Sequence, residues 1–342
     1  MNERHAPVRV IAEAGVNHNG DRDRALALVD VAAEAGADMV KFQTFKAERI
    51  VSPHAPKAAY QQRTTGTGES QLDMVRRLEL SEADHDAIIA RCAQRGIAFL
   101  STPFDMESIE LLVRKGVQLG KVPSGEVTHK AHLQAMARAF PQVIMSTGMC
   151  TLDEVRAAVD VLLGAGASRD AITLLHCNTE YPTPMADVNL RAMRTLAREL
   201  GMPVGYSDHT LGIEVPIAAV AMGATVIEKH FTLDRSLPGP DHAASLEPDE
   251  LRAMVRAVRH IEQALGDGVK APTPSEIGNR AIARRSIHIT ADLPAGTVLE
   301  AHHLAMLRPG DGISPMDQDQ VLGRTLCRPL AAGARLAPTD LA

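Results

Sequence analysis

Short segments rich in β-branched residues alternate, as far as Leu265, with longer segments whose apolar residues recur every three or four positions. The short segments predict strands and the long ones predict amphipathic helices, because side chains alternate along a strand but recur about every 3.6 residues along a helix. Eight segments have the strand pattern: VRVIAE, DMVKFQTF, IAFLSTPF, QLGKVPSGE, QVIMSTGM, ITLLHCN, PVGYSDHT and ATVIEKHFT.

The helical segments carry the residues that begin and end helices. DRDRALALVDVAAEAG and TLDEVRAAVDVLLGAG open with Asp or Thr and close with Gly, which are residues preferred at helix N-caps and C-caps. Eight strand–helix units ending near Leu265 predict an α/β protein with a closed (β/α)8 barrel. A doubly wound open sheet is the alternative, because counting units in one sequence can misassign one of them.

A different domain follows the barrel pattern. Four residues of LPAGTVLEAHHL recur at the same spacing in LAAGARLAPTDL: Leu293, Gly296, Leu299 and Leu304 correspond to Leu330, Gly333, Leu336 and Leu341. Two copies of a β-turn-β piece predict a small β-rich module. We therefore expect a barrel over residues 1–267, a linker over 268–285 with room for a short helix, and the module over 286–342.

Composition excludes several classes of protein. The 342 residues are 45% hydrophobic with a net charge of −6, which provides no basic surface for nucleic acid. The four cysteines are scattered without a CxxC pair, as in reduced cytoplasmic proteins. MNERHAPVRV lacks the apolar core of a signal peptide and no apolar run of 18 residues follows, so we expect a cytoplasmic protein with no membrane span.

Every predicted strand ends in polar residues, where a barrel carries its active site. In chain order these are Glu13; Lys41 and Gln43; Ser101 and Thr102; Lys121, Ser124 and Glu126; Ser146 and Thr147; His176 and Asn178; Ser207, Asp208 and His209; and Glu228 and His230. Any one of them could instead cap the next helix or meet solvent.

Two lysines interrupt strands that should be buried. Lys41 and Lys121 need anionic partners there, which an ion pair with Glu13 or Glu126 would supply. Two cations beside several hydroxyl groups also favour a small, multiply charged ligand such as a phosphorylated carboxylic acid.

His209 and His230 end the seventh and eighth predicted strands, which are neighbours in a barrel. Both imidazoles could therefore bind one divalent ion and leave positions open for substrate and water. Asp208 and Glu228 could orient the rings or complete the coordination. The alternative is that each histidine is an ordinary hydrogen-bonded residue.

The chain resembles the sialic acid synthase family over nearly its whole length. The resemblance rests on IAEAGVNHNGD, VKFQTFKAE, STPFD, KVPSGE, STGM, LLHCNTEYPTP, GYSDHT, EKHFTLDRSLPGPDHAASLEPDEL and LRPGDGISP. It implies a (β/α)8 barrel followed by an antifreeze-like (SAF) domain. It also implies an enzyme that condenses phosphoenolpyruvate with an N-acylated hexosamine.

The resemblance also implies roles for residues that match the family motifs. His209 and His230 would bind the metal, with Mn2+ expected and Mg2+ or Co2+ as alternatives. Glu13, Lys41, Lys121 and Glu126 would be catalytic, with either glutamate moving the proton. The expected phosphoenolpyruvate-binding residues are Lys41, Thr102, Lys121, Ser124, Ser146, Ser207 and one or both of Asn178 and Thr179. The expected sugar-binding residues are Glu13, Glu126, Tyr181, Asp241 and Arg308.

By the same resemblance, Arg308 would reach the active site of the other subunit in a domain-swapped homodimer. The expected activity is that of an N-acetylneuraminate synthase, which joins phosphoenolpyruvate, N-acetylmannosamine and water and releases phosphate by C–O cleavage. The alternative is an N,N'-diacetyllegionaminate synthase that uses 2,4-diacetamido-2,4,6-trideoxymannose, since the motifs occur in both groups. Weaker alternatives are a Schiff-base pyruvate aldolase and a non-catalytic sugar-binding protein.

Overall fold

The computed structural model describes residues 6–66 and 68–342. The first five residues of the expected barrel part lie outside the described residues. The chain forms two compact units, Met1–Asp267 and Gly268–Ala342. Among the helices described, none combines the length and apolar character needed to cross a membrane.

The first unit is a nearly closed barrel of eight parallel strands. They follow the order β3-β2-β1-β8-β7-β6-β5-β4, and the edge strands β3 and β4 pack against each other. The strands are β1 (Arg9–Gly15), β2 (Met39–Thr44), β3 (Ala98–Pro103), β4 (Leu119–Val122), β5 (Gln142–Ser146), β6 (Ile172–Cys177), β7 (Val204–Asp208) and β8 (Val226–His230). The predicted barrel is therefore confirmed, and the open sheet is not the fold.

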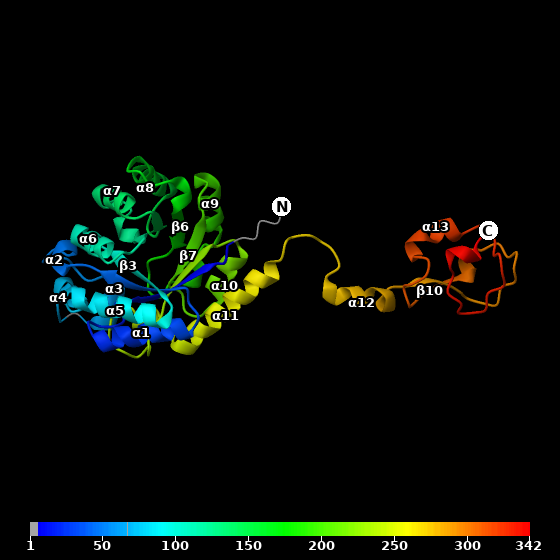
Figure 1. The fold of residues 1–342 in the computed structure, drawn as a ribbon, viewed down its shortest axis with the longest axis horizontal. Coiled ribbons are helices and arrows are strands. Elements are labelled where there is room, and N and C mark those ends of the chain that lie inside the picture. Colours follow the sequence, from blue (N-terminus) through cyan, green and yellow to red (C-terminus); the bar gives the residue numbers. More distant parts are fainter. Residues whose placement is uncertain (1–5, 67) are drawn as a thin grey trace. The chain divides into compact units, whose positions relative to one another are not determined.

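Helices surround the strands (Figure 1). Asp21, Ser81 and Thr151 cap α1, α5 and α8 by accepting hydrogen bonds from backbone N–H groups of the first turn. The helices of this unit are α1 (Arg22–Glu34), α2 (Ala47–Ile50), α3 (Ala59–Thr65), α4 (Gln71–Arg76), α5 (Glu82–Arg95), α6 (Met106–Arg114), α7 (Lys130–Ala139), α8 (Leu152–Gly164), α9 (Arg191–Leu200), α10 (Glu214–Ala221) and α11 (Pro248–Leu265).

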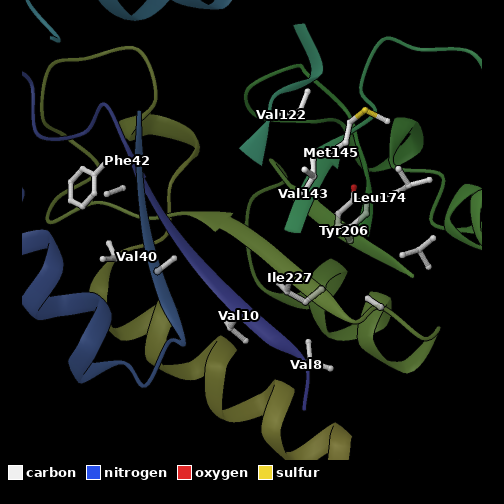
Figure 2. Close-up of a cluster of buried hydrophobic side chains, with 14 of the residues drawn as sticks. Val8, Val10, Val40, Phe42, Val122, Val143, Met145, Leu174, Tyr206 and Ile227 are labelled. Carbon is white, nitrogen blue, oxygen red and sulfur yellow. The ribbon is translucent and has the colours of Figure 1, made fainter. Parts of the chain in front are cut away.

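Alternate residues of each strand point outward and form the main core against the helices. Val10, Val40, Tyr206 and Ile227 are among these buried side chains (Figure 2). Burying one Val, Leu, Ile or Phe side chain stabilises a fold by about 1.5–3 kcal/mol. This outer core therefore holds the strands in place and leaves the intervening residues free to fill the inside of the barrel.

The second unit contains helix α12 (Pro274–Ala283), the antiparallel strands β9 (Ser286–Ile289) and β10 (Leu304–Leu307), and the short helix α13 (Gln318–Val321). The expected linker at 268–285 thus includes a helix of ten residues. Within this unit the Ala281 carbonyl accepts a hydrogen bond from Gly310 N at 2.7 Å.

The sequence repeat in the second unit has a structural counterpart. Leu293 and Leu330 are bridge partners and exchange two backbone hydrogen bonds of 2.8 and 2.9 Å. Gly296 and Gly333 have φ angles of +84° and +79°, a region that favours glycine in turns. The repeated leucines pack into one small core: Leu293, Leu299, Leu304, Leu330, Leu336 and Leu341.

Candidate active site

The inside of the barrel is built in layers. Its lower part is an apolar plug made of Ile11, Leu100, Leu119, Ile144, Leu175 and Val226, with Met39 packed against it. Side chains on the same face recur every second residue, so the next layer lies two residues further along each strand. This polar layer consists of Glu13, Lys41, Thr102, Lys121, Ser146, Cys177, Ser207 and Glu228, all of which line one cavity of about 510 Å3.

Two buried lysines lie in the polar layer between two buried carboxyl groups. Lys41 Nζ lies 3.0 Å from Glu13 Oε2, 3.5 Å from Glu228 Oε2 and 2.9 Å from Thr102 Oγ1. Lys121 Nζ lies 2.7 Å from Ser146 Oγ and 3.7 Å from Glu228 Oε1. Ser207 Oγ donates to Glu228 Oε1 at 3.0 Å. Lys41 and Lys121 thus share Glu228, and each also contacts a hydroxyl group.

The two glutamates differ in protonation. Burial raises the pKa of Glu13 to about 8, although Lys41 partly offsets this effect. Burial also acts to raise the pKa of Glu228, but Lys121 and Lys41 outweigh it and leave the pKa below its ordinary value. At neutral pH Glu13 therefore carries a proton and Glu228 is ionised. With both ammonium groups charged, the cluster has a net charge of +1, which suits an anion.

The lysines also differ. Burial would lower the pKa of Lys41, but Glu13 and Glu228 raise it above its ordinary value. Burial lowers the pKa of Lys121, against the opposing effect of Glu228. Lys41 is therefore a firmly charged anion-binding group, whereas Lys121 is the more easily deprotonated of the two.

His209 and His230 lie close together beside the polar layer. Their ring centroids are 5.4 Å apart, and both residues line the cavity. The Tyr181 ring packs on His209 at 4.1 Å and lies edge-on to His230 at 5.5 Å. Gly15, with a φ of +52°, admits this arrangement because a Cβ there would lie 3.2 Å from His230 Cε1.

Both imidazoles have the state that metal binding requires. Burial lowers the pKa of His209 to about 4 and the pKa of His230 well below its ordinary value, so both rings are neutral at pH 7. His209 Nδ1 hydrogen-bonds the Asn178 carbonyl. Because a carbonyl only accepts, Nδ1 carries the hydrogen and Nε2 keeps its lone pair.

The surroundings of His230 also fit a cation. Its Nδ1 is buried without a hydrogen-bond partner among the described residues and lies 3.9 Å from Asp241 Oδ2. Burial raises the pKa of Asp241 to about 7, and a neighbouring cation would favour its ionised form. Within the described ranges no group of three or more His, Cys, Asp or Glu side chains is placed to hold a metal. A cation would therefore complete its coordination with substrate or water.

The remaining residues of the first unit that were expected to bind phosphoenolpyruvate or the sugar line the same cavity, except Asn178. Ser124, Glu126, Thr179, Tyr181 and Asp241 all line it. Asn178 instead uses its side-chain oxygen within its own loop, accepting from Glu180 N at 2.7 Å. Of the two alternatives left open by the sequence, Thr179 is thus the one that faces the cavity.

Glu126 and Arg308 have different surroundings from the buried cluster. Glu126 Oε2 lies 2.6 Å from Nδ1 of the exposed His129. Arg308 is exposed on the second unit. The roles of both residues stay predictions.

Asp208 does not contact the histidine rings, contrary to the expectation from sequence. It alternates with Ser207 and His209 and so points out of the barrel. There it pairs with the fully buried Lys229 and accepts hydrogen bonds from Thr210.

Two residues of the cavity region, Cys177 and His129, have no role in the sequence analysis, and a third has other partners than expected. Glu228 was expected to orient a histidine ring or complete the metal coordination, whereas in the structure it lies between the two lysines. Cys177 completes the polar layer and has its Sγ 3.2 Å from Ser124 Oγ. Glu228 and Cys177 each lie two residues beyond an apolar plug residue of their strand, as Lys41 and Lys121 do, so the alternation along the strands predicts both positions. His129 lies beyond the end of β4, where this alternation does not apply.

Comparisons with known proteins agree with this architecture. Residues 28–270 match the NeuB family, and residues 284–342 match the SAF domain. The chain is 49% identical to the N,N'-diacetyllegionaminic acid synthase of Campylobacter jejuni, covering 92% of this chain and 94% of the relative. It is also 49% identical to the enzyme of the same name from Legionella pneumophila, covering 96% and 92%.

A solved structure is also similar. The N-acetylneuraminic acid (sialic acid) synthetase of Leptospira borgpetersenii is 35% identical and superposes with a TM-score of 0.70. The match covers 80% of this chain and 90% of that one.

Proposed function

Because the chain belongs to the NeuB family, we propose that it condenses phosphoenolpyruvate with 2,4-diacetamido-2,4,6-trideoxymannose and water to give N,N'-diacetyllegionaminate and phosphate. The observation that carries the choice of sugar is the 49% identity to two synthases of that name. The sequence alone favoured N-acetylmannosamine as the sugar. The comparisons favour the alternative that it left open.

The polar layer supports the binding of phosphoenolpyruvate. Lys41 and Lys121 supply two cations, and Thr102 and Ser146 supply hydroxyl groups at hydrogen-bond distance from them. The phosphate and carboxylate of the substrate would displace part of the pairing with Glu13 and Glu228. Charge-assisted hydrogen bonds of this kind are stronger than neutral ones.

His209 and His230 would hold a divalent cation, Mn2+ by preference, whose chemistry there is that of a Lewis acid toward the sugar aldehyde. The protein's own part is to present two neutral imidazoles. The carbonyl of Asn178 fixes the tautomer of His209. Tyr181 packs against both rings and limits their rotation.

Glu13 is the better placed of the two carboxyl groups expected to move the proton. It is buried in the lysine cluster and protonated at neutral pH, whereas Glu126 pairs with His129. We assign to Glu13 the donation of its proton to the aldehyde oxygen as C3 of phosphoenolpyruvate bonds to the aldehyde carbon.

Water then adds to C2 and returns one proton to Glu13. The tetrahedral intermediate breaks the bond between C2 and the bridging oxygen. Of the two protons of the water, one has thus replaced the proton that Glu13 donated, and the other leaves the C2 hydroxyl for the released phosphate as C2 becomes a ketone. Lys41 and Lys121 stabilise the charge on phosphate and carboxylate throughout.

The assembly belongs to the same proposal. The family resemblance implies a domain-swapped homodimer in which Arg308 of one chain reaches the sugar in the active site of the other. A twofold dimer would then contain two equivalent sites, each completed by one borrowed arginine.

The test is phosphate release from phosphoenolpyruvate in the presence of Mn2+ and either sugar. The proposal predicts a higher kcat/KM for the diacetamido sugar than for N-acetylmannosamine. Turnover of N-acetylmannosamine but not of the diacetamido sugar would instead indicate an N-acetylneuraminate synthase. If neither sugar supports phosphate release, the synthase activity is refuted.

The lowered pKa of Lys121 favours one rival, a pyruvate aldolase that forms a Schiff base on this lysine. Borohydride reduction in the presence of pyruvate or product separates the two activities. The synthase predicts no covalent adduct on Lys121, and a trapped adduct would support the aldolase.

A further inference from the structure

The cavity has an apolar side that the proposed chemistry does not use. A hydrophobic cluster separate from the main core forms where the chain between β2 and α5 packs against the end of the barrel. All six of its residues line the cavity: Val16, Phe45, Ile50, Val75, Leu78 and Phe104. We call these six residues the apolar wall.

The apolar wall is held in place by contacts outside the cavity. Arg76 Nε on α4 donates to Glu48 Oε1 on α2 at 2.8 Å, and Ala47 N donates to Glu79 Oε1 at 2.7 Å. The buried Lys57 donates to Thr65 Oγ1 and to the Gly66 carbonyl, each at 3.0 Å. A wall that is already assembled loses little freedom when a ligand binds.

The side chains on this side of the cavity carry amide and hydrocarbon groups. Besides the wall, the connection between β2 and α5 contributes Gln61, Gln71 and Met74 to the lining, and no charged side chain among those that the structure describes. An acetamido group matches this combination, because its methyl needs apolar contact and its amide needs polar partners. A deoxy methyl needs only the apolar contact. A hydroxymethyl group in the same place would bury a hydroxyl against hydrocarbon.

The two sides of the cavity orient the sugar. The aldehyde must lie at the polar layer and the two histidines, where phosphoenolpyruvate is bound. The wall follows β1, β2 and β3, whereas His209 and His230 lie at the ends of β7 and β8, so the C4 to C6 end of a sugar whose aldehyde is at the histidines can reach the wall. In the diacetamido sugar this end carries an acetamido group and a methyl, whereas N-acetylmannosamine carries hydroxyl groups at the same carbons.

We propose that the apolar wall determines sugar specificity, by binding the C6 methyl and the C4 acetamido methyl of the substrate and rejecting a C6 hydroxyl. The inference rests on the proposed function. It assigns the choice between the two sugars to particular residues. Ile50 and Val75 are only partly buried, so substituting them should not leave a cavity in the core.

The experiment compares three sugars that share the aldehyde end: the diacetamido sugar, N-acetyl-6-deoxymannosamine and N-acetylmannosamine. The second and third differ only by the C6 hydroxyl. Wild-type enzyme should prefer the 6-deoxy sugar by about tenfold or more in kcat/KM, the usual effect of such a group in an apolar site.

Two variants place a hydroxyl group in the wall, Val75→Thr and Ile50→Thr. Each should reduce the preference for the 6-deoxy sugar by about three- to tenfold, while the KM for phosphoenolpyruvate stays unchanged. The matched control is Val113→Thr on α6, which makes the same chemical change at an exposed position outside the cavity and should leave the preference as it is.

The outcomes separate this inference from the proposed function. Equal use of the two matched sugars by the wild-type enzyme would overturn the inference without requiring any variant to fold. An unchanged preference in both wall variants would do the same, and the synthase activity would stand. If no sugar supports phosphate release, the proposed function fails and the inference fails with it.

Discussion

Glu13 and Glu228 occupy one layer of the barrel, but their surroundings drive their pKa values in opposite directions. Burial raises the pKa of Glu13, whereas at Glu228 the same effect of burial is outweighed by Lys121, Lys41 and the hydrogen bond from Ser207 together. Pairs of carboxyl groups whose pKa values are pushed apart commonly divide acid and charge-stabilising roles between them. This difference supports Glu13 as the proton donor and Glu228 as the ionised partner of the lysines.

Replacing Glu13 by Gln should lower kcat by about 10²- to 10⁴-fold, the range found for general acids and bases. Because the protonated form is the active one, wild-type kcat/KM should also fall as the pH rises through about 8. The pH–rate profiles of the two proteins check both points. A wild-type profile that is flat through that range would contradict the role of Glu13.

The same shift predicts how stability depends on pH. Glu13 binds a proton in the folded protein up to about pH 8 but releases it near 4.5 when unfolded. Folding therefore takes up a proton in this window, and the contribution to stability is full below 4.5 and is lost as the pH rises through about 8. Urea unfolding should show wild-type stability falling with pH relative to Glu13→Gln. If the unfolding free energies of the two proteins change with pH in parallel, the raised pKa of Glu13 is contradicted.

The two histidines give a prediction that does not depend on turnover. His209→Ala and His230→Ala should each weaken Mn2+ binding by more than about 100-fold, a larger loss than removal of an outer-sphere partner causes. Titration calorimetry measures this directly. His176→Ala is the control, because His176 bonds the Val188 carbonyl and should leave Mn2+ affinity unchanged. Full turnover after exhaustive chelation would refute the metal's role.

At the scale of elements, the alternation of strand residues explains what the sequence could predict. Apolar outward residues, the inward plug and the polar layer all follow from a period of two, which is why the eight strands and most residues that line the cavity can be predicted. The same period would have placed Glu228 beside the lysines and turned Asp208 outward. Pairing partners are harder to predict, because Lys229 meets Asp208 only through the register of β7 with β8.

The connection between β2 and α5 shows where sequence patterns stop being informative. It contains three short helices of four to seven residues, too short to show helical periodicity. Its apolar residues cover the cavity instead of following one face of an element. No local rule therefore predicted the apolar wall, although every residue in it is an ordinary hydrophobic one.

The buried pair of Lys229 and Asp208 should stabilise the two strands that carry the histidines. Asp208→Asn leaves a buried ammonium without its carboxylate, which should cost about 3–5 kcal/mol of unfolding free energy. The double variant Asp208→Asn with Lys229→Met should recover part of this loss. Breaking the exposed pair of Asp249 and Arg252 is the control and should change stability little. An equal loss of unfolding free energy on breaking the buried pair and the exposed pair would contradict the stabilising role of the buried pair.

At the scale of the whole molecule, the proposal of a domain-swapped dimer joins the two units. Arg308 lies beyond α12 in a module with a small hydrophobic core of its own. The length of the intervening segment permits the module to serve its own barrel or that of a neighbour. The family resemblance favours the neighbour, and only an experiment on mixed chains distinguishes the two.

Mixing Arg308→Ala chains with Lys121→Ala chains, each inactive alone, provides that experiment. If Arg308 acts in trans, mixed dimers contain one intact site. An equal mixture should then regain about a quarter of wild-type activity, because half of the dimers are mixed and each has one working site of two. Phosphate release measures the recovery after the chains have exchanged. A complete lack of recovery would place the arginine in its own chain's site.

The central claim is that the lysine and glutamate cluster beside His209 and His230 directs water to carbon and not to phosphorus. Phosphoenolpyruvate labelled with 18O at the bridging oxygen tests this claim most directly, with the product and phosphate analysed by mass spectrometry after one turnover with the diacetamido sugar. The account predicts that the label leaves with phosphate, because the bond between C2 and the bridging oxygen breaks. Label retained in the nonulosonic acid would mean that the bond to phosphorus breaks, and would contradict the mechanism.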